Sequence, residues 1–231
     1  MSNLTVTWSA VVSGRLLSMK DSGSLEIDSG KAAARDPRRT QERILAAALK
    51  EFSAKGFSGA RVDAIARRAA INKRMLYHYF GDKEGLFREV LRRKIAERQA
   101  WNAATPEQPA EYLPLLFDLA CKDADWIRLL EWEALRGGEK PVIDEPERRA
   151  AAARGVERIR RRQASGHLSS EFDPRQVLLA IVGLTMYPVA FPQLTRLIMG
   201  RNVSDPVFQK ERREFLRRFA TAFSPAKSQP Q

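Results

Sequence analysis

The sequence predicts an all-α protein, and two observations lead to that fold class. From residue 40 onward, apolar residues recur at spacings of three and four, which is the period of amphipathic helices. No segment shows the period-two alternation between turn residues that indicates half-buried strands. With 231 residues, 44% of them apolar and 29% charged, the chain can bury a core of its own. We therefore expect packed helices in one or two domains.

The chain ends are expected to lie outside this helical region. Residues 1–36 are rich in serine and glycine without a sustained period, which is typical of a flexible extension, and residues 226–231 are expected to be a disordered tail. No Lys or Arg occurs in the first 14 residues, and Thr and Ser interrupt the apolar patch there. A secretory signal is therefore not expected, and the predicted location is the cytoplasm.

Four helices are predicted before residue 102. The first begins near Thr40 and carries an apolar stripe until Gly56, which is typical of a helix end: Ile44, Leu45, Ala48, Leu49 and Phe52. A short second helix covers residues 62–69. The third opens at Asn72, a good N-cap, and runs to Phe80, while the fourth starts at Asp82 and continues to about residue 101.

Six further helices are predicted, each bounded by Gly, Pro or Asp-Pro, at residues 110–122, 124–136, 146–165, 175–187, 193–199 and 206–223. The most apolar stretch, residues 177–192, contains two prolines and is shorter than the roughly 20 residues that a membrane span needs. It is therefore interpreted as a buried helix, and no membrane partner is expected.

The second and third helices have the features of a helix-turn-helix. Only residues 70–72 connect them, and the third helix has Lys73 and Arg74 in its first turn and Tyr77 and His78 one turn later. The major groove of B-DNA, about 12 Å wide, admits one helix, and Arg can pair with guanine while Lys and Tyr bind phosphate. His78 could equally be an exposed bystander. Tyr79 and Phe80 are assigned to packing.

The charge distribution supports a polyanionic partner at the N-terminal side. The net charge is +12 with a pI near 10.2. Residues 1–104 hold 20 Lys and Arg against 11 Asp and Glu, whereas the remainder holds 20 against 17. Another basic run, Arg158 with residues 160–162, continues an amphipathic helix, and a solvated helix face is favoured for it over a nucleic-acid patch.

Catalysis, metal binding and cofactor binding find no support in the residue types. The chain has one cysteine, Cys121, two separated histidines, His78 and His167, and no Gly-rich phosphate loop. We therefore expect no enzyme activity, no cofactor and no metal site.

The region around the predicted helix-turn-helix resembles the TetR (TetR/AcrR-like) family of bacterial transcriptional regulators. The resemblance covers about residues 38–90 without a gap and rests on these residues: Arg43, Ile44, Leu45, Ala47, Ala48, Phe52, Gly56, Phe57, Val62, Ile65, Ala66, Ala69, Leu76, Tyr77, Tyr79, Phe80, Asp82, Lys83, Glu84, Leu86 and Phe87. Further on, only the helical layout and Gly166-His167-Leu168 ahead of Asp173-Pro174 are similar.

This resemblance implies a DNA-binding domain at residues 37–82 and a helical effector-binding and dimerisation domain at residues 83–225. By position it implies DNA contacts from Arg61, Asn72, Lys73, Arg74, Tyr77, His78 and Lys83. Two positions depart from the family pattern. Arg61 stands where Ser or Thr commonly opens the second helix, and Ala70 stands where the turn usually has Gly, the residue preferred at positive φ.

A ligand pocket is predicted in the C-terminal half, because apolar cavities with a few polar groups are typical small-molecule sites. The candidate lining residues are Phe117, Cys121, Trp126, Leu129, Leu130, Glu133, Met186 and Tyr187. Filling of an ordinary helical core is the alternative for each. Glu131 or Glu133 would favour a cationic or hydrogen-bonding effector.

The last long helices carry more apolar surface than one layer needs, which together with the resemblance predicts a homodimer. The candidate interface residues are Leu178, Ile181, Leu184, Phe208, Phe215 and Phe219. The predicted function is a ligand-responsive transcriptional regulator, a repressor that binds a near-palindromic operator on double-stranded DNA as a dimer and is released by a small-molecule effector. The alternative is a basic protein that coats DNA without sequence specificity, which a titration against random competitor DNA would distinguish.

Overall fold

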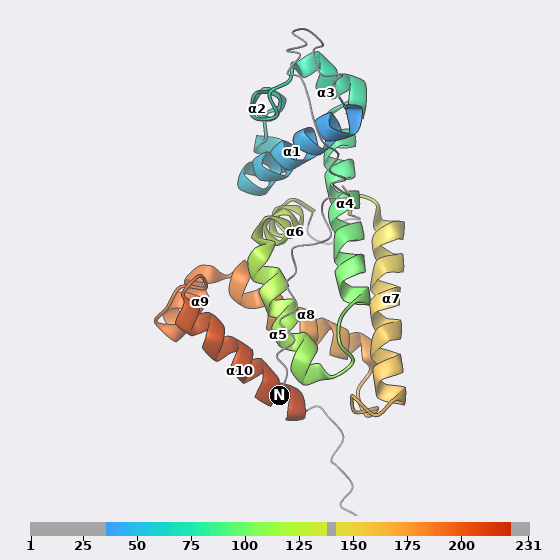
Figure 1. Ribbon diagram of the computed structural model, residues 1–231, viewed down its shortest axis with the longest axis vertical. Coiled ribbons are helices and arrows are strands. Elements are labelled where there is room, and N and C mark those ends of the chain that lie inside the picture. Colours follow the sequence, from blue (N-terminus) through green and yellow to red (C-terminus); the bar gives the residue numbers. More distant parts are fainter. Residues whose placement is uncertain (1–35, 138–141, 223–231) are drawn as a thin grey trace, which may run out of the picture. The chain divides into compact units, whose positions relative to one another are not determined.

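The computed structural model describes residues 36–137 and 142–222, and these residues form helices without any strand (Figure 1). The predicted all-α fold class is confirmed. The helices are α1 (Pro37–Gly59), α2 (Val62–Arg68), α3 (Lys73–Phe80), α4 (Lys83–Ala103), α5 (Pro109–Lys122), α6 (Ala124–Gly137), α7 (Glu145–Ala164), α8 (Pro174–Ala190), α9 (Pro192–Met199) and α10 (Pro206–Ala222). The predicted N-terminal extension, except its last residue, and the predicted C-terminal tail lie outside the described residues.

Helix α1 starts three residues earlier than its apolar stripe indicates. The Asp36 side chain accepts a hydrogen bond from the backbone N of Arg38 at 3.0 Å, and Pro37 occupies the first helical position. Proline at that position loses no hydrogen bond, since the first turn has no carbonyl to pair with. Near the other end, Gly56 leaves the helical region at φ 66°. The helix therefore bends where the sequence predicts that it ends.

Two hydrophobic clusters hold the helices together. The first joins helices α1–α4 to α6, and its fully buried members include Ile44, Phe52, Leu76 and Leu86. The second joins α5, α7, α8 and α10 around Tyr112, Phe117, Ile159, Phe208 and Leu216. Helix α6 thus packs with the N-terminal helices, while its sequence neighbour α5 packs along α10.

The contact between α1 and α6 is specific as well as apolar. Trp132 Nε1 donates a hydrogen bond to the Ser53 carbonyl oxygen at 3.1 Å, and Lys50 Nζ lies 2.5 Å from Asp125 Oδ2. The Trp132 ring covers Gly56 so closely that a Cβ there would come within 2.9 Å of it. Only glycine combines that approach with a positive φ. The N-terminal helices are therefore fixed to α6 at this point.

Helix α8 has one buried face and one exposed face, so the prediction of a buried helix at residues 177–192 is wrong for the exposed face. Ile181, Thr185 and Pro188 are buried, whereas Leu179 is 65% exposed and Tyr187 44%. No single helix of the described chain is long and apolar enough to cross a membrane. Helices α8 and α9 reach the necessary length and apolar composition only when taken together, and the chain bends by 88° between them.

Candidate nucleic-acid interface

Helices α2 and α3 are joined by a tight turn that contains a left-handed residue. The backbone N of Ala70 donates to Arg67 O at 3.1 Å, and that of Ile71 donates to Ala66 O at 3.0 Å. These two bonds form a Schellman motif, in which the first residue beyond the helix is left-handed. Ala70 takes that position at φ 50°. The departure from glycine is therefore accommodated without loss of the turn.

Arg43 on α1 supports this turn from outside. Its guanidinium donates hydrogen bonds to the carbonyl oxygens of Ala69 and Ala70, the latter at 3.2 Å. Both carbonyls follow the end of α2, where helical partners are missing. The pattern of α1 does not predict this role for Arg43, because its partners are backbone atoms 26 and 27 residues away.

Helix α3 is capped at its start and anchored by one side. Asn72 Oδ1 accepts a hydrogen bond from the backbone N of Met75 at 2.7 Å, as its N-cap assignment predicts. Leu76 is fully buried in the first hydrophobic cluster, and Tyr79 and Phe80 pack against that cluster while partly exposed. The other face of α3 is therefore held in a fixed orientation toward solvent.

The exposed face of α3 carries four of the predicted DNA contacts. Lys73, Arg74, Tyr77 and His78 are all exposed. Within the described chain, the side chains of Arg74, Tyr77 and His78 make no hydrogen bond or ion pair. Lys73 Nζ lies 3.0 Å from Asp63 Oδ1, and this contact raises the pKa of the lysine. Three of these side chains can thus meet a ligand without breaking an existing polar contact.

Arg61 and Lys83 lie at the starts of the neighbouring helices. Arg61 is exposed at the N-cap position of α2, and its backbone N donates to the buried Glu51 carboxylate at 3.3 Å. The hydrogen bond from Lys55, helped by this backbone N–H, lowers the pKa of Glu51. Lys83 Nζ donates to Ser58 O at 3.3 Å and lies 4.9 Å from the centre of the Phe57 ring. Glu51 therefore holds the backbone of the N-cap residue in place, while the first turn of α2 has no side-chain cap in the described chain.

The predicted effector residues do not gather around one cavity. Phe117, Trp126 and Leu129 are buried in the two hydrophobic clusters, and Leu130 packs against the first. The Glu133 carboxylate is paired with Arg148 at 2.7 Å, so it is not available to attract a cation. Tyr187 is exposed, and its ring lies 4.9 Å from the Phe191 ring at an interplanar angle of 36°. Of the predicted residues, Cys121 and Met186 line cavities within the described part of the chain, and each lines a different one.

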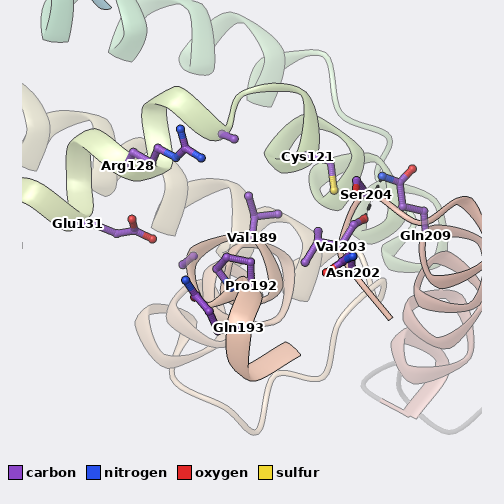
Figure 2. A pocket seen from close by; sticks show the side chains of 12 residues that line it. Cys121, Arg128, Glu131, Val189, Pro192, Gln193, Asn202, Val203, Ser204 and Gln209 are labelled. Atoms are coloured by element: carbon purple, nitrogen blue, oxygen red, sulfur yellow. Dashed lines mark hydrogen bonds between the residues drawn. The ribbon is translucent and has the colours of Figure 1, made fainter. Parts of the chain in front are cut away.

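The larger of these two cavities, of about 580 Å³, lies between the start of α6, the α8–α9 junction and the segment before α10 (Figure 2). Arg128 and Glu131 project from α6 on one side, and Gln209 on the other side donates to Val203 O at 3.1 Å. Burial raises the pKa of the Cys121 thiol to about 11, so the thiol is neutral there. The smaller cavity, of about 90 Å³, lies between α4, α5, α7 and α8.

Comparison with known proteins places this arrangement in a family. Residues 44–90 match the family described as "Bacterial regulatory proteins, tetR family", and residues 108–221 match "Tetracyclin repressor-like, C-terminal domain". The HTH-type transcriptional repressor SCO4008 of Streptomyces coelicolor is 33% identical over 168 residues, which are 73% of this chain and 88% of that repressor.

The chain belongs to the TetR family.

It is therefore a DNA-binding transcriptional regulator. A second TetR-like relative, the HTH-type transcriptional regulator RutR of Escherichia coli K12, is 30% identical over 184 residues, which are 73% of this chain and 82% of RutR. Among solved structures, the transcriptional regulator SCO4942 of S. coelicolor aligns with a TM-score of 0.65 and 31% identity over 80% of this chain and 98% of that one. The helix-turn-helix of this TetR-family chain is the α2–α3 unit.

The side chains predicted for a TetR-type dimer interface are divided between core and surface. Ile181 and Phe208 are buried in the second hydrophobic cluster, whereas Phe215 is exposed and stacks on Phe219 at 5.3 Å. Leu178 and Leu184 are half-buried. The exposed apolar side chains that the sequence analysis missed include Leu179 and Val182 on α8, Leu197 and Ile198 on α9, and Val207 on α10.

The basic run on α7 also differs from its prediction. Arg160 and Arg161 are exposed, as expected of a solvated face, but Arg162 is buried and Arg158 is half-buried. The prediction is therefore wrong for Arg162, whose guanidinium stacks over the Tyr112 ring at 4.2 Å. Among the described residues, no group of three or more His, Cys, Asp or Glu side chains could hold a metal ion.

Proposed function

We propose that this regulator is a repressor that binds a near-palindromic operator as a homodimer through α3 and is released by a small-molecule effector. Two of its relatives, SCO4008 and NicS of Pseudomonas putida, are named transcriptional repressors. A protein of the same fold, FadR of Bacillus subtilis, forms a complex with stearoyl-CoA, so this fold has room for an organic ligand.

One observation carries the DNA-reading part of the proposal. Helix α3 is capped by Asn72 and anchored by Leu76, and it presents to solvent the side chains of Arg74, Tyr77 and His78, which have no polar partner among residues 36–137 and 142–222. A recognition helix contacts base edges with its N-terminal residues, which is where Arg74 lies. We assign Arg74 to a base and Tyr77 and His78 to bases or phosphates at the groove edge.

Four other residues are assigned to the phosphate backbone. Asn72 uses its Oδ1 in the cap, which leaves its amide hydrogens for a phosphate oxygen. Lys73 carries three N–H donors, so it can keep Asp63 and bind a phosphate as well. Arg61 and Lys83 stand at the starts of α2 and α4, where an anion is also favoured by the helix dipole.

The homodimer is proposed to form through the exposed apolar sides of α8 and α10. Exposed apolar side chains that lie together mark interaction sites, and Leu179 and Val182 are exposed three residues apart on α8, as is Phe215 on α10. In a two-fold dimer the same patch meets itself, so one surface is enough. Two copies of α3 would then read half-sites about 34–36 Å apart or at a wider separation.

The effector is proposed to act through α4. This helix begins at Lys83, three residues after the end of α3, and it reaches the smaller cavity through Arg98 and Asn102. An effector can shift the DNA-binding equilibrium only as far as its preference between the two conformations allows. We propose further that the protein acts in the cytoplasm and catalyses no reaction, as its family of regulators suggests.

Selection of bound sequences from a random DNA pool tests this function. A two-fold symmetric consensus, with half-sites separated by about one helical turn or more, is the expected result. Binding without any preferred sequence, and equal competition by random DNA, would instead support the DNA-coating alternative that the charge of +12 allows.

A further inference from the structure

The smaller cavity is lined by positive and neutral polar groups and by no carboxylate. Its polar lining includes Arg98, Asn102, Tyr112, Arg158 and Arg162, and its apolar wall is formed mainly by α8. Its volume of about 90 Å³ exceeds several-fold the roughly 30 Å³ that a water molecule occupies in the liquid. The cavity can therefore accept a small charged group.

The three arginines are incompletely compensated. Arg162 Nη2 donates to Pro106 O at 2.8 Å, and its buried Nε lies 3.3 Å from Oε2 of the exposed Glu107 carboxylate without making a hydrogen bond in the described chain. Arg98 Nη1 lies 3.7 Å from Asp123 Oδ2, and neither of these buried atoms makes a hydrogen bond. The other oxygen of Asp123 is 2.9 Å from Lys94 Nζ, so one carboxylate serves two cations.

Arg158 is the least compensated of the three. Within the described residues its side chain makes no ion pair or hydrogen bond, and it is half-buried. Burial, together with the charges of Arg162, Arg161 and Arg154, lowers the pKa of its guanidinium. A buried cation without an anion is costly, and a bound oxyanion removes that cost.

Tyr112 supplies an independent sign of a ligand. Its side chain is 1% exposed, and its hydroxyl is buried without a hydrogen-bond partner in the described chain. Burial raises the pKa of Tyr112 to about 12, so the hydroxyl keeps its proton and remains a donor. Nearly all buried polar groups in native proteins are paired, so this donor is available to an acceptor in the cavity, and the three neighbouring cations favour one that is negative.

We propose that the smaller cavity binds the oxyanion group of the effector, a carboxylate or a phosphate, through Arg158, Arg98 and the Tyr112 hydroxyl. The apolar part of the effector then lies against Leu178 and Met186. This inference rests on the proposed function, because it names the chemical class of the same effector. The larger cavity supports no such assignment, since Arg128 and Glu131 give it both signs of charge.

The test titrates the full-length protein with sodium butyrate and with sodium phosphate. Tryptophan fluorescence and the thermal unfolding midpoint are followed, and sodium chloride holds the ionic strength constant. Butyramide and butylammonium chloride serve as neutral and cationic probes of similar size. We expect saturable binding of at least one oxyanion. Butyrate alone indicates a carboxylate effector, and phosphate alone indicates a phosphate ester.

Two variants tie that binding to the cavity. Arg158→Gln should weaken the oxyanion affinity about tenfold or more, because charge-assisted hydrogen bonds are the strong ones. Arg161→Gln is the matched control, since it removes the same charge from an exposed position of the same helix. Tyr112→Phe removes only the unpartnered hydroxyl, so it should reduce affinity while the unfolding midpoint of the free protein stays or rises.

The proposal is overturned by an equal response of the Arg158→Gln protein, by binding of butyramide or butylammonium in place of the oxyanions, or by no saturable response to either oxyanion. None of these readouts involves DNA. If an oxyanion binds without changing operator affinity, the oxyanion site is supported and release of the repressor by that ligand is contradicted. If the protein binds DNA sequence-specifically but binds no oxyanion, the DNA-binding function is supported and the oxyanion site is contradicted.

Discussion

Arginines occupy two contrasting environments in this protein. Arg74 is exposed on α3 and keeps its hydration, whereas Arg158 and Arg98 line a cavity where burial lowers the pKa of both guanidinium groups. An exposed cation attracts a polyanion over a distance of about one Debye length, roughly 8 Å in physiological salt, and salt weakens that attraction. A buried cation is screened much less and discriminates more strongly by geometry. In the proposed function, the same type of side chain would recognise DNA at one site and a small ligand at the other.

The largest effect in this comparison should come from the residue that orients the exposed site. Leu76→Ala removes the buried anchor of α3 and should lower the free energy of unfolding by about 2–5 kcal/mol. Thermal or urea unfolding measures this change. Leu197→Ala, on the exposed side of α9 and outside the proposed α8–α10 interface, is the control and should have little effect on the free energy of unfolding. A loss below 1 kcal/mol for Leu76→Ala would mean that the first cluster does not hold α3.

Arg74→Ala should weaken operator binding by about 1–3 kcal/mol, which is the range for a residue that reads a base. Thermal stability should stay unchanged, because the Arg74 side chain makes no polar contact in the described structure. Binding isotherms on the selected operator and on a scrambled sequence are the measurement. Equal losses on both DNAs would mean that Arg74 contacts a phosphate and not a base. In that case the slope of log affinity against log salt concentration should decrease in magnitude by about one.

Substitutions of the cavity residues Arg162 and Arg158 should differ in their effect on the free energy of unfolding. Arg162→Ala removes hydrogen bonds to Thr105 and Pro106 and the stacking on Tyr112, so it should lower the free energy of unfolding by about 1–3 kcal/mol. Arg158→Ala should change it by less than about 0.5 kcal/mol or raise it. Urea unfolding of the two proteins in parallel decides the point. Equal destabilisation by the two substitutions would show that Arg158 stabilises the fold, which contradicts its assignment as a ligand-binding residue.

Alkaline pH should destabilise the protein through Tyr112. Because the pKa of Tyr112 in the folded chain is about 12, above its ordinary value of 10, the folded state holds this proton more tightly. The contribution of Tyr112 to the free energy of unfolding is fully present below pH 10. It is lost as pH rises toward 12, by at most about 1.4 kcal/mol per pH unit. Unfolding of wild type and Tyr112→Phe between pH 9 and 11.5 should show a steeper loss for wild type. Parallel curves would contradict the burial of this hydroxyl.

The smallest effect is expected at the turn of the helix-turn-helix. Ala70→Gly should raise the unfolding midpoint slightly, because the left-handed conformation at φ 50° costs alanine about 1–2 kcal/mol and glycine almost nothing. The greater flexibility of glycine in the unfolded chain offsets about half of that gain. Differential scanning calorimetry of the two proteins measures it. A lower midpoint for the glycine variant would mean that the Ala70 backbone is not strained.

The order and type of the helices followed from local features, and the reason is visible at individual residues. Asn72 and Asp82 cap their helices with the bonds that their positions predict, and Leu76 is buried as its spacing requires. Such features depend on neighbours within one turn of helix. The start of α1 was misplaced by three residues because Asp36 and Pro37 precede its first buried apolar residue.

The candidate effector site was less predictable, because core and cavity are lined by the same residue types. Phe117 and Met186 look alike in an apolar stripe, yet the first is fully buried in a cluster and the second borders a cavity. The arginines were interpreted by their helix alone. Whether Arg162 faces solvent or Tyr112 depends on α5, whose residues lie some 50 positions away in the chain. Only tertiary packing supplies that information.

The continuity of α4 has a mechanical consequence. From Lys83 to Arg98 the helix advances by 15 residues, which at 1.5 Å each is about 22 Å. A tilt of about 10° around the Arg98 end displaces the Lys83 end by roughly 4 Å, which exceeds the length of a hydrogen bond. In a stiff helix of this length, a tilt that is too small to disturb the packing around Arg98 would still move the Lys83 end far enough to break hydrogen bonds to DNA. The same geometry would allow the ligand specificity of the cavity at the Arg98 end to be changed without changing the DNA-binding helices near the Lys83 end.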